Sequence, residues 1–308
     1  MLMKLGHILS AFIFLAGSHT ALAENLDNVK PNQIISVTLS QLHPTQPSVG
    51  YDEIYYKLGR FSHEPKKLYD TLCEINGEKG IAHFYEHSKP TDASSYKCKE
   101  PVGTERDDMK TAVIGPDAKL YLTDGHHTFV SLWQLPEAGK DLKVHVIITK
   151  DYRSESTTDF WQNMIMDNNA WLFNRYHNPI SWHQLPTDLE LSKFDDDRYR
   201  SFMYFSRGIS WDKPNPAMPY IEFYWATAVR TVFDLNQYDL NTQQGYLKAL
   251  AEGGDAIIRL RSPNLGGSGK NAVDLGQYPK VSKKGLKHLQ KRFSKLSYMI
   301  EYKQQLSK

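Results

Sequence analysis

The sequence has few cysteines, no long apolar run after its first residues, and no excess of charge of either sign. Two cysteines among 308 residues exclude a disulfide-rich scaffold and a four-cysteine zinc module. A near balance of 37 basic and 35 acidic residues excludes a protein that binds phosphate through bulk positive charge. A hydrophobic content of 40% is too high for a disordered chain. Any phosphate site must therefore be local, in a chain that folds around a substantial core.

Residues 1–23 predict a secretory signal peptide. Lys4 precedes an apolar run at residues 8–17, and Ala21 and Ala23 place small residues at the −3 and −1 positions of a cleavage site. The apolar run is too short to span a bilayer. We expect cleavage near Ala23, a periplasmic or secreted location, and a mature chain without a transmembrane segment. An uncleaved anchor or a buried strand is the alternative interpretation of this segment.

Export would place the two cysteines in an oxidising compartment. Cys73 and Cys98 could then form a disulfide closing a loop of about 25 residues, which is worth roughly 3 kcal/mol in the chain-entropy model. The alternative is two separate buried thiols.

The apolar patterning predicts an α/β domain at residues 24–150, followed by a helical region at residues 151–308 that packs on it. We interpret the aromatic residues between 161 and 182 as part of the core in a mostly helical stretch. Residues 262–278 are predicted to form a surface loop. We expect strands at residues 34–39 and 142–149 and a hairpin at residues 112–114 and 120–123. We expect helices at residues 49–61, 65–73, 80–87, 126–134, 198–207 and 220–233.

Near the C-terminus, apolar residues recur at steps of three and four. The spacing predicts one amphipathic helix, whose seam comprises Leu286, Leu289, Phe293, Leu296 and Ile300. Its outer face is rich in lysine, which suits either a solvated surface or a face for phosphate or membrane. The solvated surface is favoured, because no aromatic residues interleave with the lysines.

The stretch at residues 120–129 carries the most chemical information. An apolar strand ends at Asp124 and Gly125, and His126 and His127 then open a helix, where free N–H groups and the helix dipole favour anions. An imidazole at this place could act as a general base, donate to a phosphate oxygen or ligate a metal. Asp124 could orient an imidazole or bind a cation. The alternative is that one histidine caps the helix and the other packs.

Two motifs together resemble a known family. Residues 42–50 (LHPTQPSVG) and 124–127 (DGHH) resemble the secreted "ParB-like putative nuclease" branch of the ParB/sulfiredoxin superfamily. Residues 197–201 and 222–226, with Arg230, resemble the second half of that branch, so the similarity spans residues 33–280. The resemblance implies an α+β fold, with a small mixed sheet and helices followed by a mostly helical C-terminal half.

The resemblance also implies a pocket for a nucleotide or phosphate group, with nucleic acid or a small phosphate-containing ligand as the partner. One wall would comprise Thr45, Gln46 and Gly50, and the other Gly125, His126, His127 and Thr128. The turn lacks the cysteine of sulfiredoxins and the arginine pair of chromosome-partitioning relatives. The first loop has Gln46 where serine-kinase relatives place a carboxylate. These departures argue against those three activities.

What remains is an exported hydrolase of a phosphate-containing substrate, such as a nuclease or phosphodiesterase. Asp124, His126 and His127 are its candidate catalytic residues, and Asp124 and His126 could hold a divalent metal. The alternative is a non-catalytic periplasmic protein that binds an anion or nucleotide in the same pocket.

Two further patterns have open alternatives. Arg200 could bind the substrate phosphate; the favoured alternative is a buried Arg–Glu pair among Arg200, Glu222 and Arg230 that ties two helices together. Residues 83–87 (HFYEH) match the H-x-x-E-H pattern of a zinc peptidase, which requires both histidines on one helix face. We rank this peptidase below the phosphate hydrolase, because a proline at residue 90 would end such a helix directly after the motif.

Overall fold

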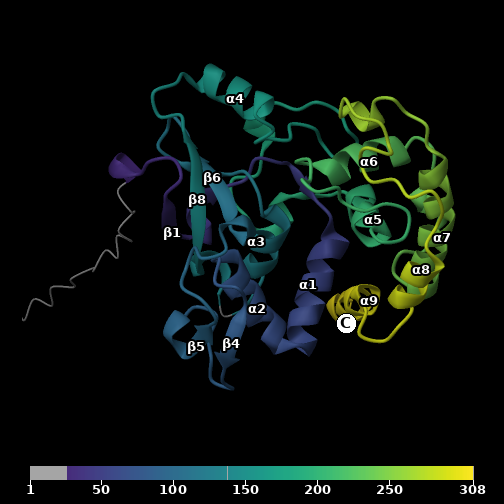
Figure 1. Cartoon of the computed structure of the whole chain (residues 1–308), viewed down its shortest axis with the longest axis horizontal. Helices are drawn as coiled ribbons and strands as arrows, with labels where there is room; N and C mark the ends of the chain where they lie inside the picture. The colour runs from purple at the N-terminus through teal and green to yellow at the C-terminus, as the bar shows by residue number, and fades with distance from the viewer. Residues whose placement is uncertain (1–25, 137, 308) are drawn as a thin grey trace, which may run out of the picture.

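The computed structural model describes residues 26–136 and 138–307, and the predicted signal peptide lies outside them. The fold is α+β, as expected, with a mixed sheet at one end of the molecule and a cluster of helices at the other (Figure 1). The strands are β1 Ile34–Thr38, β2 Leu42–His43, β3 Ser48–Val49, β4 Ile81–Phe84, β5 Tyr96–Cys98, β6 Lys110–Ile114, β7 Leu120–Leu122, β8 Lys143–Asp151 and β9 Asp195–Asp196. The helices are α1 Tyr51–His63, α2 Pro65–Ile75, α3 His126–Trp133, α4 Thr157–Met166, α5 Arg198–Ser206, α6 Ile221–Val229, α7 Gln243–Arg259, α8 Lys283–Leu289 and α9 Lys295–Leu306.

Five strands form the main sheet in the order β1-β8-β6-β7-β2. β1 runs antiparallel to β8, and β6 and β7 form the predicted antiparallel hairpin. β6 runs parallel to β8, and β2 runs parallel to β7. Every second residue of β1 is buried, so this strand has one face on the core. The pairing of β2 with β7 places the first loop beside the turn that follows β7, which is what creates the site described below.

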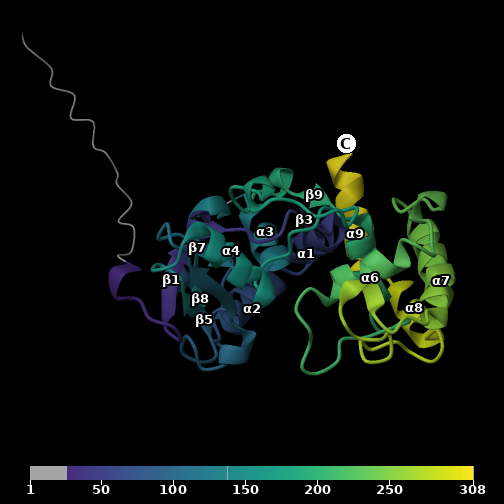
Figure 2. The same cartoon turned by 90° about the horizontal axis from the view of Figure 1, so that it is seen from above.

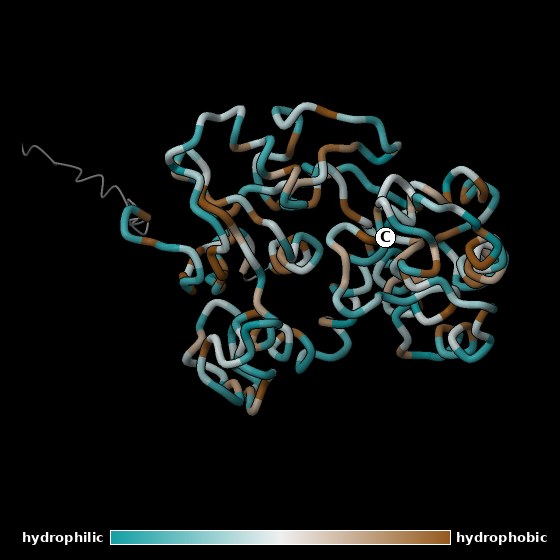
Figure 3. Tube along the Cα trace, turned by 45° about the horizontal axis from the view of Figure 1, so that its top comes forward, coloured by the Kyte–Doolittle hydropathy of each residue, from teal (hydrophilic) through white to brown (hydrophobic). Residues whose placement is uncertain are grey.

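The apolar core is divided between the two ends of the molecule. One cluster joins the main sheet to α1, α2 and α3, and a second fills the space among α5, α6, α7, α8 and α9. Apolar segments gather along the sheet and inside the helical end, while the loops are mostly hydrophilic (Figure 3).

The chain crosses between the two ends more than once. α9 packs along α1, and β9 pairs with β3 (Figure 2). Tyr56 of α1 belongs to the second cluster, and Leu189 and Phe194 belong to the first. Both ends of the molecule are thus built from both halves of the chain. The domain boundary at residue 150 stays a prediction.

The prediction of a helix at residues 80–87 is wrong. This segment forms β4, which pairs antiparallel with β5, and Ile81 lies opposite Cys98. The predicted disulfide between Cys73 and Cys98 is present and joins α2 to β5. The ring of Phe84 stacks on Tyr69 of α2, 4.9 Å between centroids. These tertiary contacts hold the segment extended, and local patterning could not reveal them.

The single amphipathic helix expected near the C-terminus is also wrong. α8 ends at Leu289, and α9 begins only after Ser294, whose side chain accepts from the Ser297 N–H. Between them Phe293 has a φ of +62° and is 59% exposed, so it is not part of a buried seam. Likewise, between residues 161 and 182, where we expected a mostly helical stretch, the end of α4 is the only α-helical part.

Within the part of the chain that the structure describes, no helix has both the length and the apolar character needed to cross a membrane.

Candidate functional site

The turn between β7 and α3 depends on Gly125. Its φ is +97°, a left-handed conformation that an L side chain rarely adopts. A Cβ atom there would also lie 2.7 Å from the Lys110 side chain. Gly125 therefore lets the chain turn tightly at the end of β7, and α3 begins with His126 and His127.

His126 ties this turn to the first loop. Its side chain is buried, and its Nε2 accepts the backbone N–H of Thr45 at 3.1 Å. The Thr45 hydroxyl donates to the carbonyl of Leu122 at 2.6 Å, so the loop is bound to β7 as well. Burial lowers the pKa of His126 to about 4, which leaves the ring neutral and able to accept at neutral pH.

His127 makes the matching contact further along the loop. Its Nε2 accepts the backbone N–H of Gly50 at 3.0 Å and lies 3.9 Å from the Glu53 carboxylate. Its Nδ1 is 3.5 Å from the guanidinium of Arg200. Burial, followed by the charge of Arg200, lowers the pKa of His127 well below its usual value. The backbone N–H of the loop thus occupies the Nε2 lone pair of each histidine.

Gly50 allows α1 to begin directly against α5. A Cβ atom at this position would lie 2.6 Å from the Ser201 hydroxyl and 2.9 Å from the Ser201 backbone nitrogen. The same hydroxyl accepts the N–H of Asp52 at 3.1 Å. This close approach brings the first turn of α1, which contains Glu53, next to Arg200.

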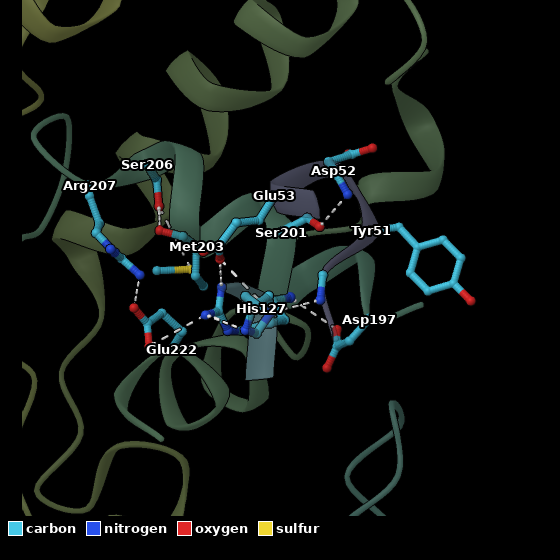
Figure 4. Close-up of polar contacts among 12 residues, drawn as sticks. Tyr51, Asp52, Glu53, His127, Asp197, Ser201, Met203, Ser206, Arg207 and Glu222 are labelled. Atoms are coloured by element: carbon cyan, nitrogen blue, oxygen red, sulfur yellow. Dashed lines mark hydrogen bonds and ion pairs between the residues drawn. The ribbon is translucent and has the colours of Figure 1, made fainter. Parts of the chain in front are cut away.

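Buried charges from three elements meet at this place (Figure 4). Arg200 of α5 donates to Glu53 of α1 at 2.9 Å and lies 3.9 Å from Glu222 of α6. Glu222 also accepts from Arg207 and pairs with Lys213 at 2.9 Å. Figure 4 shows Arg207 and Glu222 pointing toward each other, with Glu53 directed at His127. The cluster therefore joins α1, α5 and α6 through charge-assisted hydrogen bonds.

The neighbouring charges change the acid–base behaviour of this cluster. Burial alone would raise the pKa of Glu53, but the adjacent charge of Arg200 outweighs it and holds that pKa well below the usual range. Burial, followed by the charges of Arg207 and Arg200, lowers the pKa of Lys213 to about 7. Glu53 is thus a carboxylate at all ordinary pH values, whereas Lys213 changes charge near neutrality.

These groups line a cavity of about 700 Å³. One wall comprises the first loop and the β7–α3 turn, and we call it the histidine wall. The opposite wall comprises Arg200, Arg207, Lys213 and Glu222, and we call it the arginine wall. Two loops, at residues 167–169 and 217–220, complete the rim. In the fold, the cavity lies between the sheet end and the helical end of the molecule.

The structure brings most of the predicted site residues together. Gln46, Gly125, His126, His127, Thr128 and Arg200 all line the cavity. Thr45 and Gly50 lie behind this surface and supply the N–H groups that the two histidines accept. Gln46 donates to the carbonyl of Ser48, which shapes the loop.

Asp124 also lines the cavity, but it does not take the role predicted for it. Its side chain is 64% exposed, and its carboxylate faces Lys110 at 3.5 Å. The described hydrogen bonds of the two histidines go to the first loop and to Arg200, so Asp124 does not orient either ring.

Asp124 and His126, the predicted ligand pair, belong to no group of three or more potential metal ligands within the part of the chain that the structure describes. Among the described residues, the group of potential ligands within reach of one ion is Cys73, Glu78 and Cys98, and its two cysteines are joined in the disulfide. The Nε2 of His126 is occupied by Thr45.

Two other motifs require correction. His83 lies in β4 and His87 in the turn after it, and both are exposed, so the H-x-x-E-H pattern has no helix on which to form a zinc site. Arg230 pairs with Asp197 at 3.1 Å, not with Glu222. The expected buried Arg–Glu contact between helices does exist, between Arg200 and Glu222, and Arg200 also faces the cavity. Both interpretations of Arg200 are therefore compatible with the structure.

Several residues of the site were missed by the sequence reasoning. Glu53 and Lys57 are one helical turn apart on α1, and Arg207 and Lys213 follow α5; all four line the cavity. The signal that was available for Glu53 and Lys57 is their position just after the motif at residues 42–50. Arg207 and Lys213 lie in no motif and reach the site only through the packing of α5 and α6.

Comparison with known proteins agrees with this architecture. The model of a family described as "Putative ParB-like nuclease" matches residues 35–231. The chain belongs to the ParB-like nuclease family. The crystal structure of protein Atu1540 from Agrobacterium tumefaciens is similar at 19% identity and a TM-score of 0.51, covering 73% of this chain and 90% of that one. This likeness concerns the fold alone. No curated protein matches the chain.

Proposed function

We propose that this ParB-like protein binds a phosphate ester in the cavity and hydrolyses it. The observation that carries the proposal is a pair of unsatisfied donors. The Nε–H groups of Arg200 and Arg207 are buried and have no hydrogen-bond partner within the described residues. Buried donors are normally paired, so these two N–H groups are suited to donate to a bound ligand. Two guanidinium groups beside a cavity suit the oxygens of a phosphate.

The surrounding charges suit hydrolysis. Transfer of a phosphoryl group needs positioning and charge stabilisation more than covalent chemistry. Arg200, Arg207 and Lys213 would hold the phosphate oxygens, and the Glu53 carboxylate would accept a hydrogen bond from the attacking water. The water oxygen bonds to phosphorus, the ester oxygen leaves, and the proton lost by water ends on the leaving alcohol or in solvent. In this scheme His126 and His127 hold the first loop against the β7–α3 turn, because their Nε2 atoms already accept N–H groups of that loop.

The second candidate function is binding of an anion or nucleotide without turnover. The engagement of both histidines by the loop favours it, because neither Nε2 is available as a general base. The same cavity and the same arginines would serve this function.

A hydrolysis assay separates the two candidates. Purified protein is incubated with bis(4-nitrophenyl) phosphate or 4-nitrophenyl phosphate, with EDTA or with added Mg²⁺, Mn²⁺ or Zn²⁺. Turnover that falls about a hundredfold in Glu53→Gln supports the hydrolase. Calorimetric binding of phosphate without turnover under any condition supports the binding protein, and neither turnover nor binding rejects both.

Matched variants guard against indirect effects. Glu53→Gln keeps an oxygen that can accept from Arg200, so the cluster should stay folded. Arg207→Gln provides an independent test and should weaken phosphate binding. Glu86→Gln changes an exposed carboxylate in the H-x-x-E-H segment and serves as the control. A loss of activity in this control equal to that of Glu53→Gln would argue against a role for the cavity.

We also propose export to the periplasm or medium. The signal-like residues 1–23 and the Cys73–Cys98 disulfide support it, since disulfides persist in oxidising compartments. Cell fractionation with mass spectrometry of the mature N-terminus tests this point. A cytoplasmic protein that retains residues 1–23 would reject it.

A further inference from the structure

A second hollow, with a volume of about 410 Å³, adjoins the cavity. Four residues line both spaces: Lys57, Lys110, Thr128 and Tyr204. The rest of its lining comes mostly from α1, from α2 and from the first residue of α9, the helix that packs along α1 (Figure 1). A small ligand in the cavity can therefore extend into this second space.

Basic side chains dominate the charge of this hollow, and we call it the basic hollow. The four cations that line it are Lys57, Arg60, Lys110 and Lys295. Two of them have carboxylate partners, because Lys110 lies 3.5 Å from Asp124 and Arg60 lies 4.0 Å from Glu64. The basic hollow thus contains two cations that its ion pairs do not account for.

These two cations are Lys57 and Lys295. Within the described residues, the ammonium group of neither takes part in an ion pair or a hydrogen bond, and that of Lys295 lies over the ring of Tyr204. The hollow has two carboxylates of its own, Glu74 and Asp108, and neither is within ion-pair distance of these lysines. Ammonium groups beside such a space suit the oxygens of a phosphate, which lysine binds as a point charge.

Burial acts on both lysines. It lowers the pKa of Lys57, and the charge of Glu53 offsets this lowering only in part. Burial, followed by the charge of Arg207, lowers the pKa of Lys295. An anion bound beside them would favour the charged form of both ammonium groups, so both would contribute to its affinity.

Tyr204 joins the basic hollow to the arginine wall. Its ring centre lies 4.7 Å from the Arg207 guanidinium and 4.7 Å from the Lys295 ammonium. Arg207 belongs to the arginine wall, and Lys295 lines the basic hollow. The two sets of cations are therefore neighbours across one aromatic ring, a separation that two anionic groups of one small molecule can span.

We propose that the basic hollow is a second anion subsite, which holds a second phosphate group of the ligand. This inference rests on the proposed function and names its substrate class, a small molecule with two phosphate groups. In the cavity, the water oxygen bonds to the first phosphorus and the bond from that phosphorus to the alcohol oxygen breaks. The alcohol oxygen takes up the proton that water loses, and the alcohol keeps its second phosphate beside Lys57 and Lys295.

The test compares two sugars that differ by one phosphate group. Isothermal titration calorimetry measures the binding of fructose 1,6-bisphosphate and of fructose 6-phosphate to the full chain. We expect the bisphosphate to bind at least tenfold more tightly, as contacts with two charged groups require. Equal affinities for the two sugars would overturn the inference.

Variants of Lys295 locate the second subsite, because this residue lines the basic hollow and not the cavity. Lys295→Gln should reduce the preference for the bisphosphate to about twofold and leave the affinity for fructose 6-phosphate unchanged. Lys295→Arg keeps the positive charge and should keep the preference. A full preference in Lys295→Gln would place the second phosphate elsewhere and contradict the proposal.

A matched control removes the same charge nearby. Lys291 is exposed, precedes Lys295 by four positions and does not line the basic hollow. Lys291→Gln should therefore bind both sugars as the wild type does. Equal losses in Lys291→Gln and Lys295→Gln would mean that only net charge matters, which would overturn the proposal. Urea denaturation verifies that the variants are folded.

Pyrophosphate and orthophosphate identify what carries the second phosphate group. A preference for pyrophosphate that also depends on Lys295 extends the ligand class to phosphoanhydrides. A preference limited to the bisphosphate restricts the class to phosphate groups on a carbon framework. Either result supports the second subsite.

Failures of the two proposals are distinguishable. If fructose 6-phosphate binds and the second phosphate adds nothing, the inference fails and the proposed function stands. If the bisphosphate binds in a manner that depends on Lys295 but no ester is hydrolysed, the subsite stands and the hydrolase is rejected in favour of the binding protein. If no phosphate compound binds, both proposals fail.

Discussion

The histidine wall and the arginine wall enclose the same cavity but are held together by different forces. In the histidine wall, two neutral imidazoles accept backbone N–H groups, and no charge is needed. In the arginine wall, buried guanidinium groups are balanced by Glu53 and Glu222. A neutral clamp fixes shape and is insensitive to a ligand's charge, whereas a balanced ion cluster can exchange a carboxylate partner for a phosphate. If the cavity binds a phosphate as proposed, the histidine wall would supply its shape and the arginine wall its affinity.

The largest effect is expected in the arginine wall. Arg200→Met should lower the free energy of unfolding by about 3–5 kcal/mol, because it leaves Glu53 as a buried carboxylate without its cation. Urea denaturation measures the loss. Arg198→Met changes an exposed residue of the same helix and should cost less than about 1 kcal/mol. Similar losses in both variants would show that the buried cluster contributes no more to the free energy of unfolding than an exposed arginine does.

The histidine wall should be sensitive to acid. The pKa of His126 is about 4 in the folded chain and near 6.5 when unfolded, so the unfolded state binds more protons between these values. Stability is therefore complete above pH 6.5 and is lost as pH falls toward 4, by about 3 kcal/mol for this one group. His127 acts in the same direction.

Urea denaturation at pH 7.5, 6 and 5 measures this loss. His126→Gln cannot titrate and should reduce the acid dependence, whereas His83→Gln, at an exposed position, should leave it unchanged. An unaltered pH profile in His126→Gln would mean that the histidine wall is not held by a neutral imidazole.

A smaller effect is expected on ligand affinity. The Lys213 ammonium, with its pKa of about 7, loses its charge as pH rises through neutrality, so anion affinity should fall from pH 6 to pH 8. Sulfate is the probe, since its own charge is constant over this range. Lys213→Met should weaken sulfate binding about tenfold at pH 6 and little at pH 8. Lys270→Met, at an exposed position, should keep the wild-type profile; a flat wild-type profile would contradict the role of Lys213.

The smallest effect is expected at Asp124. Its carboxylate is exposed and faces Lys110, so Asp124→Asn should change stability by less than about 0.5 kcal/mol and turnover by less than about twofold. A tenfold loss of turnover would instead support a role for Asp124 in orienting a histidine.

The elements of the sheet end were largely predictable. β1, the β6–β7 hairpin, α1, α2 and α3 follow local patterns of burial and turn residues that are legible in the sequence. Gly125 with the histidine pair indicated the turn, and the motif at residues 42–50 indicated its partner loop. The segment at residues 80–87 was misread, because pairing with β5 and packing on Tyr69 overrode its local preference.

The charged half of the site was only partly predictable. Arg200 and Glu222 were noticed, but Arg230 was assigned to the wrong carboxylate, and Arg207 and Lys213 were not noticed. Arginines and carboxylates occur throughout the chain, and spacing along the sequence does not show which of them share a buried space. The roles predicted for the histidines also needed geometry, because either ring nitrogen could have faced the cavity.

The sequence by itself determined the family, the α+β class, the disulfide pair and the position of the β7–α3 turn, because each depends on short motifs or on local periodicity. The tertiary structure alone decided that the histidines bind the first loop, that Glu53 joins Arg200, and that Phe293 lies exposed between α8 and α9. The physical reason is common to all three. Contacts between residues distant in the chain depend on how the sheet end and the helical end pack, and no local pattern records that packing.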